Sequence, residues 1–401
     1  MVTKPEYIQT EAGFIPVDWE AKRLGDVISR CFSGATPRRN RPEFYGGDIR
    51  WITSGELRYD VITDTAEKIS QDAVEQTNLT IVPTGTFLMA VTGLEAERTR
   101  GACAIVGAPS TTNQSCMAVF PTDALVTEYL FYYYVFRGKQ LALQYCQGTK
   151  QQSYTAGLVK QLPIALPPST TEQHKIVAVL SDVDALLNGL AQLIAKKRDL
   201  KQAAMQELLS GKTRLPGFID EWEVRRLGDL VQIEKGQLIT RNTLLPGEIP
   251  VIAGGKKPAY HHAVANRIGR TITISASGAN AGYVALYNDP IFASDCSTIS
   301  ESDRYCLDFV YYQLLRVQSA IYKLQTGGAQ PHIHAKDLNP MTFSFPNLTE
   351  QTAIAAVLID LDAEVAGLEA RREKTQALKQ GMMQELLTGR IRLVQPEVLH
   401  A

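Results

Sequence analysis

The 401-residue sequence lacks the features that mark several classes of protein. Its six cysteines are scattered, and no two of them have the CxxC spacing of a metal or redox site, so we expect reduced thiols in a cytoplasmic protein. No run of about eighteen apolar residues appears, which argues against a transmembrane helix and a membrane partner. The N-terminal stretch MVTKPEYIQTEAGF contains acids and no apolar core, so it does not resemble a secretory signal. The formal net charge is −1, so overall charge does not indicate a nucleic-acid partner.

Common catalytic motifs are also missing. The sequence has no Asn-Pro-Pro-aromatic signature of amino-methyltransferases, no HExxH and no GxSxG. Gly211-Lys212-Thr213 resembles the end of a phosphate-binding loop, but Gln206 stands where that loop requires glycine, so a helix end explains it better. His332 and His334 lie two apart and would share one face of a strand, yet no other metal ligands cluster near them, so a surface polar contact is the better interpretation. We therefore expect no catalytic residues, no metal and no cofactor in this chain.

The sequence does contain a long segment that occurs twice. Residues 171–210 and 349–388 align without a gap at an offset of 178 (349 − 171), and neither contains proline. Apolar residues recur three and four positions apart in each, which predicts a long helix that pairs as a coiled coil, antiparallel if a globular domain precedes each helix at opposite ends. The expected seam residues are Ile176, Val179, Val183, Leu186, Leu190, Leu193, Leu200 and Ala204 in the first copy, and Ile354, Val357, Leu361, Val365, Leu368, Leu378, Met382 and Leu386 in the second.

Both copies carry signals for where the helix begins and ends. Ser169 with Glu172, and Asn347 with Glu350, have the spacing of a capping box. A glycine follows the last turn of each copy, where a left-handed residue would end the helix; these glycines are Gly211 and Gly389. About forty residues at about 1.5 Å each would span roughly 60 Å.

A shorter repeat precedes each variable region. WEAKRLGDV at 19–27 matches WEVRRLGDL at 222–230 at an offset of 203 (222 − 19). The intervening inserts therefore differ by 25 residues (203 − 178), and their sequences are largely unlike. Both inserts end alike, because Gly148 and Leu158 align with Gly328 and Leu338 at an offset of 180. Strand-like and helix-like stretches are mixed in each insert, so we expect two related α+β domains.

This organisation divides the chain into five segments. They are 1–168, the N-terminal frame and first domain; 169–212, the first long helix; 213–346, the second frame and second domain; 347–390, the second long helix; and 391–401, a C-terminal tail. Similar frames that hold dissimilar inserts indicate a scaffold that presents two different readers.

Polar loops in both inserts have the residue types that contact DNA, since arginine suits phosphate and guanine and asparagine suits adenine. In the first insert the candidates are Thr36, Arg38, Arg39, Asn40 and Arg41 in one turn, and Lys150, Gln151, Gln152 and Tyr154 in another. In the second insert they are Lys256, Lys257, Tyr260 and His261 in one loop, and Gln330, His332 and His334 in another. Three arginines in one turn are too close to neutralise one another, so an anionic partner would explain them. The alternative is that these loops are solvated turns.

A set of short motifs extends along nearly the whole chain. The frames, helix starts and helix endings occur twice in the same order, and three further motifs occur once. The motifs are the frames FIPVDWEAKRLGD and GFIDEWEVRRLGD, the segments Gly34-Ala35-Thr36-Pro37, Trp51-Ile52-Thr53-Ser54 and Thr112-Asn113-Gln114 in the first insert alone, the helix starts PPSTTEQ and PNLTEQ, and the endings MQELLSGKTRL and MQELLTGRIRL. In this order they resemble the specificity subunit of type I restriction-modification systems. The resemblance adds Ser54, Asn113 and Gln114 to the candidate DNA-contacting residues.

The resemblance implies a fold and a function. The fold would be α+β, with two related target-recognition domains joined by two long helices packed as an antiparallel coiled coil, a pseudo-twofold internal repeat. Each domain would read one half of a bipartite target in double-stranded DNA, and the helices would set the spacer. The chain would not be an enzyme; two methyltransferase subunits, which use S-adenosylmethionine, and two motor-nuclease subunits would complete the complex.

Two other interpretations remain open. Methylation or cleavage by this chain itself would require the missing motifs. A coiled-coil scaffold would join protein partners through the helices, with inserts that bind protein rather than DNA.

Overall fold

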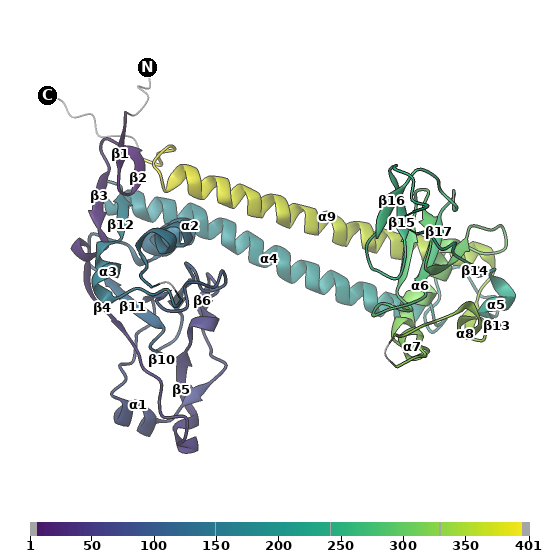
Figure 1. Cartoon of the computed structure of the whole chain (residues 1–401), viewed down its shortest axis with the longest axis horizontal. Helices are drawn as coiled ribbons and strands as arrows, with labels where there is room; N and C mark the ends of the chain where they lie inside the picture. The colour runs from purple at the N-terminus through teal and green to yellow at the C-terminus, as the bar shows by residue number, and fades with distance from the viewer. Residues whose placement is uncertain (1–5, 149, 241, 329, 395–401) are drawn as a thin grey trace. The chain divides into compact units, whose positions relative to one another are not determined.

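The computed structural model describes residues 6–148, 150–240, 242–328 and 330–394. These residues form two compact units. The first unit contains the described part of residues 1–189 and 372–401, and the second contains that of residues 190–371. Two long helices, α4 (Thr170–Leu208) and α9 (Leu348–Leu386), each contribute a part to both units (Figure 1). This division cuts through both helices, whereas the five segments expected from the sequence follow element boundaries.

A mixed β-sheet covered by a helix forms the centre of the first unit. Its strand order is β4-β11-β8-β9-β6, antiparallel except for the parallel pair β6 and β9. The strands are β4 (Ile28–Ser33), β6 (Val61–Ile62), β8 (Phe87–Ala90), β9 (Cys103–Val106) and β11 (Cys116–Pro121). Helix α2 (Thr127–Tyr145) packs on β8, where the rings of Tyr134 and Phe87 meet edge to face with centroids 5.6 Å apart. Every residue of β8 and β9 is buried, which explains their unbroken apolar sequences.

A smaller sheet lies on the side of the first sheet away from α4 (Figure 1). Its order is β10-β5-β7, with β5 (Tyr45–Ile52) parallel to β10 (Ser110–Thr112) and antiparallel to β7 (Lys68–Ile69). Helix α1 (Gln71–Thr77) completes a separate small core around Phe44 and Trp51. The remaining elements of the unit are β1 (Tyr7–Thr10), β2 (Gly13–Pro16), β3 (Glu20–Arg23), β12 (Pro163–Leu166), α3 (Ala156–Gln161) and the 3-10 turns Leu24–Asp26, Pro42–Phe44 and Ser54–Glu56.

The second unit repeats this topology. Sheet β14-β20-β17-β18 matches β4-β11-β8-β9, sheet β16-β15-β19 matches β7-β5-β10 with the same parallel and antiparallel pairs, and β13-β21 matches β3-β12. The strands are β13 (Glu223–Arg226), β14 (Glu234–Lys235), β15 (Ile249–Ile252), β16 (Tyr260–His262), β17 (Thr271–Ser275), β18 (Val284–Tyr287), β19 (Phe292–Ala293), β20 (Cys296–Ser300) and β21 (Thr342–Phe345). The helices are α5 (Leu227–Leu230), α6 (Leu307–Arg316), α7 (Gln318–Lys323) and α8 (Ala335–Leu338). The prediction of two related α+β domains is confirmed.

The alignment of the two inserts is off by one residue near their ends. Gly148 and Gly327, which are 179 apart, both have a left-handed φ, +100° and +91°. Strands β12 and β21 begin at residues 163 and 342, which are also 179 apart. The predicted match of Gly148 to Gly328 is therefore wrong, because two adjacent glycines in the second insert look alike in sequence and only the backbone conformation distinguishes them.

In each unit the parts of α4 and α9 lie side by side and run antiparallel (Figure 1). In the first unit the Asp184 carboxylate accepts hydrogen bonds from Lys379 Nζ at 2.6 Å and from Tyr132 Oη at 2.8 Å. Burial raises the pKa of Tyr132 and the bond to Asp184 adds to the shift, so the hydroxyl remains a donor. The second unit repeats the cluster with the helices exchanged, and its members are Lys201 of α4, Asp362 of α9 and Tyr312. The predicted antiparallel pairing is confirmed.

The seam between the helices matches the prediction only in part, since Ile176 and Leu190 of α4 and Ile354 and Leu386 of α9 are buried as expected. Leu186, Leu193 and Leu200 were expected in it, but they are 43%, 40% and 48% exposed, and Leu378 of α9 is 60% exposed. The buried apolar residues along α4 that the pattern did not predict are Leu180, Ile194, Met205 and Leu208. Helix α4 carries two apolar stripes with the same period, and the sequence pattern does not say which one faces α9.

The caps of both helices hold as predicted. Ser169 Oγ accepts a bond from Glu172 N at 3.4 Å, and Asn347 Oδ1 accepts one from Glu350 N at 2.9 Å. After the last turns the backbone is left-handed, with φ of +73° at Gly211 and +67° at Gly389.

The glutamates of the caps have a role that the capping motif did not predict. Glu172 is fully buried and accepts two hydrogen bonds from Arg392, at 2.7 and 2.9 Å. Glu350 is equally buried and accepts two from Arg214, both at 2.6 Å. Each arginine follows the end of the other long helix, so each unit joins the start of one helix to the tail of the other. We call these two contacts the Glu–Arg pairs.

Helix α4 is the one described helix that is long and apolar enough to cross a membrane by length and composition, with a window of mean hydropathy 1.5. A core helix of a soluble protein passes the same test. Two aspartates, Asp182 and Asp184, interrupt this stretch, and Asp184 pairs with Lys379 of α9. The absence of a membrane partner stays a prediction.

Replacing Glu172 by glutamine should lower the free energy of unfolding of the first unit by about 2 kcal/mol, because Arg392, whose side chain is 11% exposed, would lose its buried counter-charge and keep only the partly exposed Asp18. Glu350→Gln should do the same to the second unit. Glu20→Gln is the matched control, since the exposed pair of Glu20 with Lys22 contributes about 0–1 kcal/mol. Urea denaturation with hydrogen exchange resolved by unit would measure the effects, and equal losses in Glu172→Gln and the control would contradict this account.

Candidate nucleic-acid interface

In the first unit, the loop after β4 turns sharply at Gly34. A Cβ at this position would overlap the carbonyl of Thr112, so glycine is required. Ala35 N then donates to Thr112 O at 3.1 Å, and Trp51 Nε1 donates to Ala35 O at 3.1 Å. The loop is thereby bound to the carboxyl ends of the parallel strands β5 and β10.

Several candidate residues meet at this place. Thr36 Oγ1 donates to Gln114 Oε1 at 2.5 Å, and Asn113 N donates to Ile52 O at 2.9 Å, two residues before Ser54. The Asn113 side chain accepts from Ser115 N at 3.0 Å, so its oxygen is used within its own turn. Thr36, Ser54, Asn113 and Gln114 are all at least partly exposed, and these bonds bring their loops together.

Residues 150–153, which follow helix α2, join the same place through the β8–β9 connection. Leu94 N donates to Gln152 O at 3.1 Å, and Gln152 N donates to Glu95 Oε2 at 2.9 Å. Lys150 and Gln151 are exposed. Tyr154 is only 4% exposed, so the structure places this candidate in the core of the first unit rather than on its surface. We call the segments 34–41, 53–60, 91–102, 113–115, 147–148 and 150–153 the first edge.

The three arginines of the 34–41 turn differ in their partners. Arg39 makes two bonds to Glu67, at 2.7 and 2.8 Å, and its guanidinium lies over the ring of Tyr45 at 4.6 Å. The bond to Arg39 lowers the pKa of Glu67, so the pair stays ionised. Arg41 pairs with Glu43 at 2.8 Å. Counter-charges within the chain therefore account for Arg39 and Arg41. Arg38 alone of the three is exposed without a side-chain partner among the described residues, and Asn40 is exposed beside it.

The second unit has a counterpart of the Gly34 turn that sequence comparison missed. A Cβ on Gly236 would overlap the carbonyl of Ser294, and Gln237 N donates to Ala293 O at 2.9 Å, as Ala35 does to Thr112. The polar residues that follow, Gln237, Thr240, Asn242 and Thr243, were absent from the candidates. The sequence does contain a signal for this turn. Gly34 follows Trp19 by 15 residues and Gly236 follows Trp222 by 14, so aligning the two tryptophans leaves the glycines one position apart.

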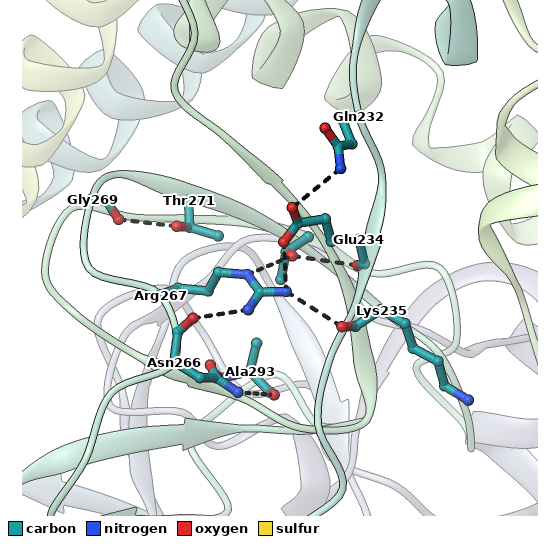
Figure 2. Close-up of polar contacts among 9 residues, drawn as sticks. Gln232, Glu234, Lys235, Asn266, Arg267, Gly269, Thr271 and Ala293 are labelled. Atoms are coloured by element: carbon teal, nitrogen blue, oxygen red, sulfur yellow. Dashed lines mark hydrogen bonds and ion pairs between the residues drawn. The ribbon is translucent and has the colours of Figure 1, made fainter.

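Arg267 holds this second turn in place (Figure 2). Its guanidinium donates to Thr298 Oγ1 at 3.0 Å and to Lys235 O at 3.3 Å, and it pairs with Glu234 at 3.0 Å. The neighbouring Asn266 side chain bonds both the N and the O of Ala293, at 2.6 and 2.9 Å. Arg267, which is mostly buried, thus holds the strand end before Gly236, and Asn266 holds the one before Ser294, so both side chains have a structural use.

The other loops of the second unit converge in the same way. Ser277 pairs with the backbone of His332 and donates from its hydroxyl to Asp295, and Gly278 N donates to Pro331 O at 3.0 Å. The rings of His332 and His334 stack with centroids 6.2 Å apart. Lys256, Lys257, Gln330 and His334 are exposed, and Lys256 lies 5.5 Å from the ring centroid of Tyr283. We call the segments 236–240, 242–247, 253–259, 276–283, 294–295, 326–328 and 330–334 the second edge.

Two candidates lie apart from this convergence. Tyr260 and His261 are exposed on β16, the outer strand of the small sheet, and no hydrogen bond or ion pair in the described ranges joins their side chains to the second edge. Over those same ranges no group of three or more histidine, cysteine or acidic residues is arranged to hold a metal, so His332 and His334 have no third ligand there.

Two related domains with matching topology and edges of different side chains define a protein with two recognition modules. The family model of the type I restriction modification DNA specificity domain matches residues 16–197 and 219–379. The chain therefore belongs to the family of type I restriction-modification specificity subunits, which recognise DNA sequence and are non-catalytic.

Individual relatives agree with this assignment. The type I restriction enzyme MjaIX specificity subunit of Methanocaldococcus jannaschii is 32% identical over 250 residues, which cover 58% of this chain and 56% of that protein. The putative MjaX specificity subunit of the same organism is 25% identical over 96% of both chains. The solved S subunit from M. genitalium shares the fold, with a TM-score of 0.64 and 16% identity over 92% of this chain and 96% of that one.

Replacing Arg38 by alanine should weaken binding to every DNA sequence alike and reduce the slope of log affinity against log salt by about 0.9, the value for one phosphate contact. Arg39→Ala should instead lower the stability of the first unit, because it removes the pair with Glu67 and the contact with Tyr45. Salt-titrated binding and thermal denaturation would separate the two effects. If both variants reduced the slope of log affinity against log salt equally, Arg39 would contact DNA phosphate despite its pairing with Glu67.

Proposed function

We propose that this chain reads a bipartite target in double-stranded DNA, one half-sequence with each edge. The repeated topology carries the proposal. Equivalent strand ends present both edges, but the side chains differ: arginine, threonine and glutamine in the first, and lysine, histidine and glutamine in the second. Such residues contact base edges and phosphates, and different sets favour different sequences.

We further propose that α4 and α9 set the spacer between the half-sequences. Each helix has 39 residues, or about 60 Å at 1.5 Å per residue. That length corresponds to more than one turn of duplex at about 3.4 Å per base step. The Glu–Arg pairs and the Tyr–Asp–Lys clusters support a rigid helix pair in each unit, and a rigid pair is what a ruler requires.

The exposed stripe of α4 supports docking of partner subunits. Leu186, Leu193 and Leu200 recur every seven residues and are 40–48% exposed. A heptad stripe that the helix pair leaves uncovered suits packing by a further helix. Two methyltransferase subunits that use S-adenosylmethionine would bind this region and methylate the target, and two motor-nuclease subunits would complete the restricting complex in the cytoplasm. Catalysis would reside in those partners, and no cofactor would bind this chain.

Exchanging one insert tests the bipartite reading. Replacing residues 29–165 by the corresponding insert of a relative with a different target should change one half of the recognised sequence and leave the other half and the spacer intact. Sequencing methylated sites in a host that carries the whole system would show the result. A change in both halves, or in neither, would count against independent readers.

Lengthening both helices by one heptad tests the ruler. Positions after Lys197 in α4 and after Val365 in α9 face each other, because Lys201 contacts Asp362 and Arg198 contacts Glu369. Seven residues at both places preserve the seam and add about 10 Å, so the spacer should grow by up to about three base pairs. The same insertion in one helix alone is the control that breaks the register. If the complex with both insertions still methylated targets with the original spacer length, the partner subunits rather than the helices would position the domains.

A further inference from the structure

The loop between β8 and β9 in the first unit differs from its counterpart in the second. It runs through residues 91–102 and carries Glu95, Glu97, Arg98 and Arg100. The counterpart between β17 and β18 runs through residues 276–283, Ala-Ser-Gly-Ala-Asn-Ala-Gly-Tyr, and bears no charge. The first loop is thus longer and charged in a protein whose two domains otherwise share their topology.

Bonds within this loop fix its shape. Arg100 Nε donates to Leu94 O at 2.9 Å, and Arg100 NH2 donates to Glu95 O at 2.8 Å. The backbone N of Arg100 and that of Thr99 donate to Ala96 O at 3.0 and 3.1 Å. An arginine that bonds the carbonyls of its own loop closes the loop, so the residues at its tip are held before any partner arrives.

The acids of the loop are occupied. The Glu95 carboxylate accepts from Gln152 N at 2.9 Å, and Glu97 lies 3.6 Å from Lys139 on α2. Arg98 is exposed, and within the described part of the chain no hydrogen bond or ion pair holds its guanidinium. A Cβ built on Gly55 would lie 3.4 Å from Arg98 NH2, so the guanidinium rests beside the residue that follows Ser54. Arg98 therefore stands on the first edge between the loops that carry Ser54 and Gln152.

We propose that Arg98 is a specificity-determining residue that reads a guanine in the half-sequence bound by the first edge. The inference rests on the proposed function and deepens it. Arginine recognises guanine by donating two parallel hydrogen bonds to O6 and N7 in the major groove. A guanidinium without a counter-charge, on a loop that is already ordered, loses little freedom when it makes such bonds. The uncharged loop of the second unit offers no cation at the matching place, so this reading belongs to the first half-sequence alone.

The experiment uses the chain purified with the subunits that co-purify with it. Selection from random duplexes would compare the wild type with Arg98→Ala and Arg98→Lys. Arg98→Ala should reduce the preference for guanine at one position of one half-sequence by about tenfold or more and leave the other positions unchanged. Arg98→Lys should retain the overall salt dependence, because it keeps the charge, and lose part of the guanine preference, because it lacks the paired donors.

A base analogue sharpens the test. 7-Deazaguanine at that position removes the N7 acceptor, so it should weaken wild-type binding and have no further effect on Arg98→Ala. Thermal denaturation should show the same midpoint for both proteins, since no hydrogen bond or ion pair of the Arg98 side chain supports the fold among the described residues. Arg38→Ala is the matched control, because it should weaken all duplexes alike.

Two results would overturn the proposal. A uniform loss of affinity in Arg98→Ala would identify a phosphate contact, and unchanged preferences would identify a solvated side chain. Failure of the proposed function has a different signature, because the wild-type complex would then select no sequence at all.

Discussion

The structure depends on a buried ion pair that occurs once in each unit, between Glu172 and Arg392 in the first and between Glu350 and Arg214 in the second. Glu172 and Glu350 are fully buried, and an isolated buried carboxylate is so costly that each requires its arginine. Arg392 and Arg214 supply two bonds each, and their guanidinium groups also lie over the rings of Trp19 and Trp222. The frame motif, the helix start and the tail after the helix therefore meet at one point in each unit. This meeting explains why these three short sequences recur together, and it leaves antiparallel pairing as the arrangement that satisfies both carboxylates.

The glutamine next to each buried glutamate extends the same junction into the domain. Gln173 Oε1 accepts from Val126 N at 2.8 Å, and Gln351 Oε1 accepts from Cys306 N at 3.0 Å. Both bonds satisfy the backbone at the place where the main helix of the domain begins, α2 in one case and α6 in the other. The frame thus orients each domain through a few polar contacts near the long helices, and the loops on the edges are free to differ because they carry none of these contacts.

Much of this fold follows from sequence, and the exceptions have physical reasons. The long helices, their caps and the two α+β domains were predictable because period, capping residues and repeats are local or duplicated signals. The seam was predictable only in part, since α4 has two apolar stripes and which of their residues become buried depends on the neighbouring elements. The candidate site followed the same rule. The 34–41 turn was found from its residue types, but the pairing of Arg39 with Glu67, the burial of Tyr154 and the Gly236 turn depend on contacts between distant parts of the chain.

The division of the chain between its units bears on how it is made. The second unit is one continuous stretch, residues 190–371, so all of its parts have been synthesised before residue 372 is added. The first unit cannot close until Arg392 reaches Glu172, which lies 220 residues earlier. During synthesis, Glu172 in the first domain therefore lacks its arginine until the end of the chain is made. The apolar surface that Met383, Leu386 and Leu387 will cover also stays exposed, while the second domain completes its core. Vectorial synthesis imposes an order of folding on two domains that are nearly equivalent in topology.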